Sequence, residues 1–81
     1  MKGVLKMRIY VINQLQGFRG YVDAEGIHIE KNNNLKLGIN TRYIVLMSKL
    51  ASEYSNMESI YAELCDRLEG DFASVWKYPI Y

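Results

Sequence analysis

The sequence contains little of the chemistry that most enzymes and disulfide-stabilised domains need. Its 81 residues include one cysteine, one proline and one histidine. A single cysteine excludes a disulfide framework and a cysteine-rich zinc site, and it suits a reducing compartment. The histidine stands in no metal-binding pattern, and the chain has neither a nucleophile motif nor a glycine-rich phosphate loop. We therefore expect no enzyme, no bound metal and no cofactor.

Long apolar stretches are also missing. The longest unbroken apolar run, Ile44 to Met47, is far shorter than the roughly 20 residues of a membrane-spanning helix. The first residues, MKGVLKMRIY, have neither the apolar segment nor the small-residue cleavage site of a signal peptide. We expect a cytoplasmic protein with no membrane partner. A content of 49% apolar and 23% charged residues fits one small globular domain spanning 1–81.

The first half of the chain alternates between apolar and polar residues at the period of a β-strand. Turn-forming residues such as Gly17, Gly26 and Asn33 separate the alternating segments, a pattern typical of an antiparallel meander. A last alternating stretch predicts a strand that returns to the sheet. Pro79 has no N–H to donate, so this strand is expected at a sheet edge. The predicted strands are about 3–12, 18–24, 27–31, 35–39 and 72–80.

Helical periodicity begins after Asn40 and is the strongest pattern in the chain. Neither glycine nor proline interrupts it before Gly70, and the spacing predicts a helix over about 41–69. Asn40 or Thr41 is expected to cap its start, and Gly70 lies where a left-handed residue follows a helix end. The apolar stripe consists of Tyr43, Met47, Leu50, Tyr54, Met57, Tyr61, Leu64 and Leu68.

The length of this helix raises a geometric question. It would be roughly 43 Å long, against about 30 Å for the diameter of a compact chain of this size. Either the helix breaks near Ser55, which has capping-box spacing to Glu58, or its overhang packs on a second copy. The stripe keeps its phase past Ser55, which favours a continuous or gently kinked helix, and we predict a homodimer that buries its overhang. The predicted fold class is α+β, an antiparallel sheet of four to five strands with one long helix on one face.

Charge is divided unevenly along the chain. Residues 1–50 carry eight Lys/Arg and three Asp/Glu, a net charge of +5, whereas 51–71 carry one Arg and six acids, a net charge of −5. On the predicted strands, Arg and Tyr occupy positions that alternate away from the core. These residue types bind single-stranded nucleic acid and also form the hot spots of protein interfaces. The candidate binding residues are Arg8, Tyr10, Arg19, Tyr21, His28, Lys77 and Tyr81.

The acidic residues of the predicted helix form a second candidate surface, which suits a partner with a basic groove. Ordinary solvation is the alternative explanation for both surfaces. This acidic flank comprises Glu58, Glu63, Asp66 and Glu69.

In small size, lack of a catalytic set and aromatic-rich dipolar surface, the chain is similar in kind to accessory proteins of phages and mobile elements that bind and inhibit a host or defence protein, such as the anti-CRISPR proteins. This resemblance of character implies a non-enzymatic protein-binding module. It includes no shared motif, so no residue roles follow from it. The alternative is nucleic-acid or nucleotide binding through the basic and aromatic sheet face.

Overall fold

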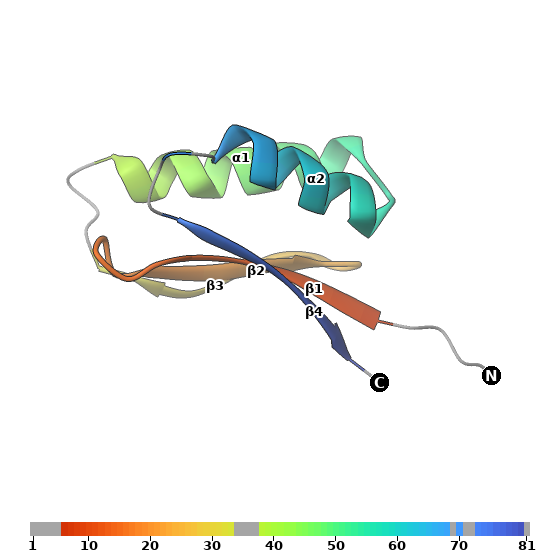
Figure 1. The fold of residues 1–81 in the computed structure, drawn as a ribbon, viewed down its shortest axis with the longest axis horizontal. Helices are drawn as coiled ribbons and strands as arrows, with labels where there is room; N and C mark the ends of the chain where they lie inside the picture. Colours follow the sequence, from red (N-terminus) through yellow and green to blue (C-terminus); the bar gives the residue numbers. More distant parts are fainter. Residues whose placement is uncertain (1–5, 34–37, 69, 71–72, 81) are drawn as a thin grey trace.

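The structure, a computed structural model, describes residues 6–33, 38–68, 70 and 73–80. Within these residues the fold is α+β, with a four-stranded antiparallel sheet and two helices that lie against the same face of the sheet (Figure 1). The sheet order is β3-β2-β1-β4. The strands are β1 (Lys6–Asn13), β2 (Phe18–Asp23), β3 (Gly26–Asn32) and β4 (Ser74–Ile80).

The first three strands form the antiparallel meander that the alternation predicts, and β4 returns to pair with β1. β4 is an edge strand, as the lone proline predicts, with Pro79 opposite Met7. The strand predicted at 35–39 falls mainly on residues 34–37, which lie outside the described residues. Of its remainder, Gly38 lies in a bend and Ile39 begins a helix.

The turn between β1 and β2 depends on a glycine. Gly17 has a φ of 62°, and its N–H donates to the carbonyl oxygen of Gln14 at 3.1 Å. A Cβ atom at Gly17 would lie 2.8 Å from the Cβ of Asn33, whose own N–H donates to the Gly17 carbonyl at 3.0 Å. The left-handed backbone and the close approach of the chain after β3 therefore both require glycine here.

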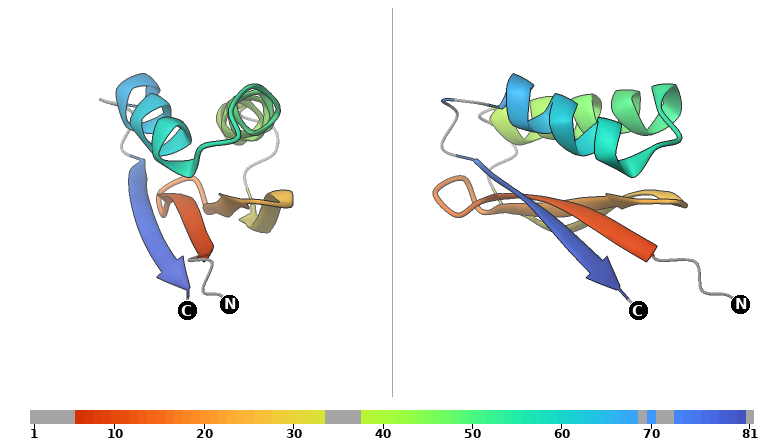
Figure 2. Two further views of the ribbon diagram at one scale, coloured as in Figure 1. Left: turned by 90° about the vertical axis from the view of Figure 1, so that its right-hand side faces the viewer. Right: turned by 45° about the vertical axis from the view of Figure 1, so that its right-hand side comes forward.

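The favoured prediction of one continuous helix is wrong, and the alternative of a break near Ser55 is confirmed. The chain forms two helices, α1 (Ile39–Glu53) and α2 (Met57–Arg67), side by side over the sheet (Figure 2). Tyr54 is extended, and Asn56 starts α2 by accepting a hydrogen bond from the Glu58 N–H at 2.8 Å. Asparagine caps a helix strongly, so a local cap outweighs the continuous apolar stripe. α1 is only about 22 Å long.

The break changes which residues of α2 face the core. Ile60, which lies outside the predicted stripe, is buried, whereas Tyr54 in the middle of the stripe is exposed. The homodimer prediction rested on an overhanging helix, and that argument no longer applies to two shorter helices. Neither helix in the described part of the chain is long and apolar enough to span a membrane.

The start of α1 also differs from the prediction. Gly38, with a φ of 76°, precedes the helix, and no side chain caps it. Asn40 lies inside the first turn, fully buried, where its Nδ2 donates to the Gln16 carbonyl at 3.1 Å and to Asn32 Oδ1 at 2.9 Å. Asn40 therefore joins the helix to the β1–β2 turn and to the end of β3 instead of capping it.

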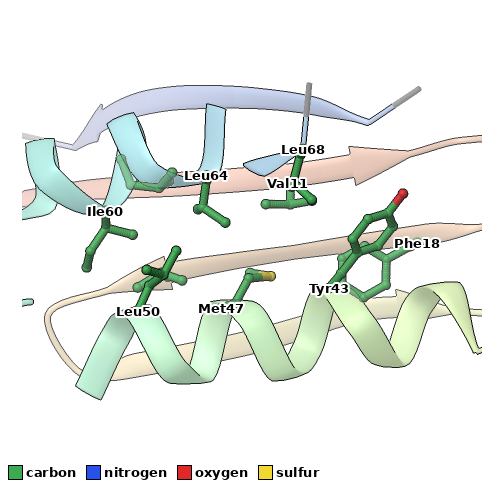
Figure 3. Packing of buried hydrophobic residues seen from close by; sticks show 10 residues of the cluster. Val11, Phe18, Tyr43, Met47, Leu50, Ile60, Leu64 and Leu68 are labelled. Carbon is green, nitrogen blue, oxygen red and sulfur yellow. The ribbon is translucent and has the colours of Figure 1, made fainter. Parts of the chain in front are cut away.

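The core fills the space between the helices and the sheet (Figure 3). At one end the rings of Phe18 and Tyr43 lie 5.2 Å apart, and the Nδ2 of buried Asn13 donates to the Tyr43 hydroxyl at 2.8 Å. The buried cluster consists of Ile9, Val11, Phe18, Val22, Tyr43, Met47, Leu50, Ile60, Leu64 and Leu68.

Candidate functional site

The sheet face opposite the helices is covered by no other element of the described chain (Figure 2). Its side chains come from the strand positions that alternate with the buried ones. The register places Tyr10 between Tyr21 of β2 and Trp76 of β4, and it pairs Arg8 with Tyr78. We call this surface the open face, and its residues are Arg8, Tyr10, Ile12, Arg19, Tyr21, Asp23, His28, Glu30, Trp76 and Tyr78.

A row of aromatic rings crosses the open face. The ring centroids of Tyr10 and Tyr21 are 5.0 Å apart, and Tyr78 meets Tyr10 edge-on at 6.1 Å. On the other side, His28 stacks on Tyr21 at 4.6 Å with an angle of 18° between the ring planes. Neighbours on both sides leave Tyr21 only 9% exposed although no helix covers it. The centre of the open face is therefore packed and held in one arrangement.

Two arginines lie over these rings. The Arg8 guanidinium carbon is 4.3 Å from the centroid of Tyr21, and its Nη1 donates to the Tyr10 hydroxyl at 3.1 Å. That hydrogen bond raises the pKa of Arg8 above its usual value. Arg19 lies 5.8 Å from the Tyr10 centroid, and its Nε is 2.9 Å from Glu30 Oε1. Cation–π contacts and an ion pair thus orient both guanidinium groups.

The hairpin between β2 and β3 brings three possible metal ligands together. The ligand atoms of Asp23, Glu25 and His28 lie within 4.8 Å of one another. Asp23 Oδ1 accepts the Glu25 N–H at 2.9 Å and lies 3.0 Å from His28 Nε2. Burial acts to raise the pKa of Asp23, but the hydrogen bonds from Glu25 and His28 lower it more, and the net pKa is below its usual value. Hydrogen bonding within the hairpin accounts for this arrangement.

A groove of about 440 Å³ lies on the open face along β1 and β4. Its most exposed walls are the aromatic side chains of Trp76 and Tyr78, which are 59% and 58% exposed. Neighbouring exposed aromatic rings, unlike a single exposed apolar residue, are typical of an interaction surface. The groove is lined by Arg8, Tyr10, Ile12, Arg19, Trp76, Lys77 and Tyr78.

The structure brings five of the seven candidate binding residues onto one face, namely Arg8, Tyr10, Arg19, Tyr21 and His28. Tyr81 lies outside the described residues.

Lys77 points to the opposite side of the sheet, because the register pairs it with buried Ile9. There its Nζ lies 3.1 Å from Glu58 Oε1 and 4.9 Å from the Tyr61 centroid. The prediction that Lys77 alternates away from the core is therefore wrong, although Lys77 also borders the groove at the sheet edge.

The predicted acidic flank is divided among different neighbours. Glu58 contacts Lys77 of β4, whereas Glu63 pairs with Arg67 of its own helix at 3.1 Å. Asp66 is exposed on α2, and Glu69 lies outside the described residues. Because two of these carboxylates already have cationic partners, the flank offers less free negative charge than its sequence suggests.

Sequence reasoning did not select Trp76 and Tyr78, the most exposed rings of the open face. Trp76 and Tyr78 alternate with Lys77 along β4. Assigning Lys77 to the face away from the core therefore assigned both aromatic residues to the core face. The signal that would have corrected the phase is cross-strand pairing, since β4 returning antiparallel to β1 aligns Trp76 with Tyr10.

Comparisons with known proteins assign the chain to no family. No protein-family model matches it, and neither a curated protein nor a solved structure matches it. The argument for function therefore rests on the geometry of the open face.

Proposed function

We propose that this chain is a small non-enzymatic protein-binding module that holds its partner on the open face. The observation that carries the proposal is the exposure of Trp76 and Tyr78 beside Tyr10 and Arg8 on one sheet. Trp, Tyr and Arg are the residues most enriched among interface hot spots. Tyr78 and Arg8 both contact Tyr10, which restricts these two side chains before binding, so less conformational entropy is lost when a partner docks.

The charge of the open face favours a protein partner over nucleic acid. Arg19 is already paired with Glu30, and Asp23 adds a second carboxylate to the same face. A phosphate backbone gains affinity by releasing counterions from many contacts with cations, and nearby carboxylates oppose that gain. A protein surface, in contrast, pairs readily with a mixture of aromatic, cationic and anionic groups.

Nucleic-acid or nucleotide binding is the second candidate, and the lining of the groove is the observation in its favour. Two cations, Arg8 and Arg19, border the groove together with the rings of Tyr10 and Trp76, whereas the Lys77 ammonium is paired with Glu58. Base stacking with phosphate contact needs such a combination. Salt dependence separates the two candidates, because phosphate contacts lose affinity steeply as salt rises.

The test is affinity capture from cells of the source organism by the tagged chain and by matched variants, followed by mass spectrometry. Trp76→Ala and Tyr78→Ala remove rings of the groove. Leu15→Ala is the control, because Leu15 is an exposed large hydrophobic residue in the β1–β2 turn, away from the groove. We expect a protein that survives nuclease treatment, is captured by Leu15→Ala and is lost with both groove variants.

Two outcomes would contradict the proposal. Capture that is unchanged in Trp76→Ala and Tyr78→Ala would remove the open face as the binding surface. Capture that disappears after nuclease treatment, with a steep salt dependence that flattens in Arg8→Ala, would support the nucleic-acid candidate instead.

Three narrower statements belong to this proposal. Inhibition of a host or defence protein is the form suggested by the resemblance to phage accessory proteins, and assays of the captured partner with and without the chain test it. A cytoplasmic location is also proposed, because a single cysteine suits a reducing compartment. The homodimer stays a prediction, and light scattering that gives the 9.4 kDa monomer mass at micromolar concentration would contradict it.

A further inference from the structure

The groove on the open face is rich in hydrogen-bond donors. Trp76 offers an indole N–H and Arg8 a guanidinium group, and neither of these side chains can accept a hydrogen bond. Among the described residues that line the groove, none has a carboxylate or amide side chain. The hydroxyl groups of Tyr10 and Tyr78 both donate and accept, and the Tyr10 hydroxyl already accepts from Arg8 Nη1 at 3.1 Å. A ligand of this groove therefore needs acceptors more than donors.

The two exposed rings of β4 have polar groups that the fold does not use. Neither the Trp76 indole N–H nor the Tyr78 hydroxyl forms a hydrogen bond with a described residue. The Trp76 ring also stacks on no described ring, although the register sets it opposite Tyr10. Both the face of the indole and its N–H are therefore available to a ligand.

Charge does not select the ligand of this groove, because two of its cations already have partners. Arg19 Nε lies 2.9 Å from Glu30 Oε1, and Lys77 Nζ lies 3.1 Å from Glu58 Oε1. An anionic ligand would have to compete with these carboxylates. The groups that the groove offers freely are neutral aromatic rings and the donors that they carry.

The regular backbone conformations of a protein partner differ in the acceptors that they offer. A helix uses its carbonyl groups in its own hydrogen bonds. A β-strand carries one N–H for each carbonyl, so it also needs acceptors, which this groove has in short supply. A polyproline II helix has no internal hydrogen bonds, so its carbonyl groups are free. Each proline in it also lacks an N–H and adds an apolar ring.

We propose that the groove of the open face binds a proline-rich segment of the partner protein in the polyproline II conformation. The proline rings pack on Trp76 and Tyr78, and carbonyl groups of the segment accept from the indole N–H and the Tyr78 hydroxyl. Aromatic-lined grooves bind such segments in several kinds of domain, because the segment is already extended and loses little entropy. The proposal rests on the function proposed for the open face and names the segment held there.

The experiment uses the only tryptophan of the chain, which lies in this groove, as the reporter of binding. The full chain is titrated with an oligoproline peptide of about ten residues, roughly 31 Å long in the polyproline II form. One control peptide of equal length alternates glycine and serine, and a second is an amphipathic helix of leucine and lysine. We expect a saturable blue shift of the tryptophan emission with oligoproline alone, with little dependence on salt.

Point variants locate the peptide while keeping the reporter. Tyr78→Ala removes the second exposed ring, and we expect it to weaken oligoproline binding by about tenfold or more. Tyr78→Phe keeps the ring and removes the hydroxyl donor, so a smaller loss of about two- to tenfold is expected. Tyr78 is 58% exposed, so circular dichroism should show both variants folded. Leu15→Ala, outside the groove, should bind oligoproline like wild type.

Several results would overturn the proposal. Tryptophan emission that does not respond to oligoproline at millimolar concentration is one, and equal binding of either control peptide is another. Equal affinity of wild type and Tyr78→Ala would place the peptide outside the groove. A single-stranded oligonucleotide that binds more tightly than oligoproline, with a steep salt dependence, would make nucleic acid the occupant.

The capture experiment separates failure of this inference from failure of the proposed function. If a captured protein is lost with Trp76→Ala and Tyr78→Ala but oligoproline neither binds nor displaces it, the open face stays a protein-binding surface and only the proline-rich segment is rejected. Capture that is unchanged in both variants rejects the open face and the segment together. Displacement of the captured protein by oligoproline, and not by the glycine–serine peptide, is the result that we expect.

Discussion

On the side of the sheet that the helices cover, Ile9, Val11 and Val22 are wholly buried, whereas on the opposite side Trp76 and Tyr78 are more than half exposed. The first set lies on β1 and β2 and the second on β4, and all three strands belong to one sheet. The covered side gains stability by removing aliphatic surface from water. The open face instead keeps large rings in solvent, and their stacking and cation–π contacts stabilise an arrangement without a covering layer.

The open face therefore combines a packed centre at Tyr21 with exposed aromatic rings at its β4 edge. Tyr10 contacts Tyr21 and Tyr78. Arg8 lies over the Tyr21 ring and donates a hydrogen bond to the Tyr10 hydroxyl. The centre of the open face is therefore fixed by its own side chains, while Trp76 stays available at the edge. A surface of this kind can bind without a large ordering cost, because its anchors are partly positioned in advance.

The largest expected loss of stability comes from a substitution on the covered side of the sheet. Leu64 is fully buried between α2 and the sheet, so Leu64→Ala should lower the free energy of unfolding by about 2 to 5 kcal/mol. Chemical denaturation measures this change. Leu15→Ala, at an exposed position, is the control and should have little effect. A loss below about 0.5 kcal/mol for Leu64→Ala would mean that α2 does not pack as described.

The second prediction concerns the polar end of the covered side. Asn40→Ala removes the donors that reach the Gln16 carbonyl and Asn32 Oδ1, and we expect a loss of about 1 to 3 kcal/mol. Gln14→Ala changes an exposed amide near the same turn and should be almost neutral. Equal denaturation midpoints for Asn40→Ala and wild type would show that Asn40 does not join α1 to the turn.

Most of the architecture was predictable from the sequence, because the first three strands carry a clear two-residue period and the segment after Asn40 carries a clear helical one. The break between the helices was one of two alternatives in the sequence. Ser55 and Glu58 have capping-box spacing, but the apolar stripe continues through Tyr54 and favoured a continuous helix. What decides the break is a local competition, in which Asn56 caps a new helix at Glu58. Stripe periodicity records side-chain polarity and does not reveal such a cap.

The open face was predictable only in part, for a related reason. Arg8, Tyr10, Arg19 and Tyr21 lie on two strands joined by a short turn, so their common face follows from the hairpin register. β4 follows two helices, and both alternating phases of β4 contain apolar residues. Its phase is set by long-range pairing with β1, which places Trp76 rather than Lys77 on the open face.

The third prediction uses pH to test the hairpin end of the open face. Asp23 has a lowered pKa in the folded state because hydrogen bonds outweigh the effect of burial. A group whose pKa is lowered by folding stabilises the protein fully above its unfolded pKa of about 3.9, and this stabilisation is lost as pH falls through the folded pKa. Denaturation as a function of pH should therefore show a smaller acid-induced loss for Asp23→Asn than for wild type.

The control for this prediction is Asp66→Asn, which removes an exposed carboxylate from α2. We expect its acid-induced loss of stability to resemble that of wild type. Identical pH profiles for Asp23→Asn and wild type would contradict a stabilising role for the Asp23 hydrogen bonds with Glu25 and His28.

The smallest expected change in stability comes from Trp76→Ala on the open face, where stability and partner affinity should respond differently. Trp76→Ala should change the free energy of unfolding by less than about 1 kcal/mol, because the indole is 59% exposed on an edge strand. The same change should weaken the binding of a captured protein partner by at least about 2 kcal/mol, measured by calorimetry.

Tyr21→Ala is a less suitable test, because Tyr21 is 9% exposed and stacks on His28, so its loss disturbs the open face itself. A large loss of stability in Trp76→Ala would show that the indole contributes to folding. An unchanged affinity would show that the partner does not contact the β4 side of the open face.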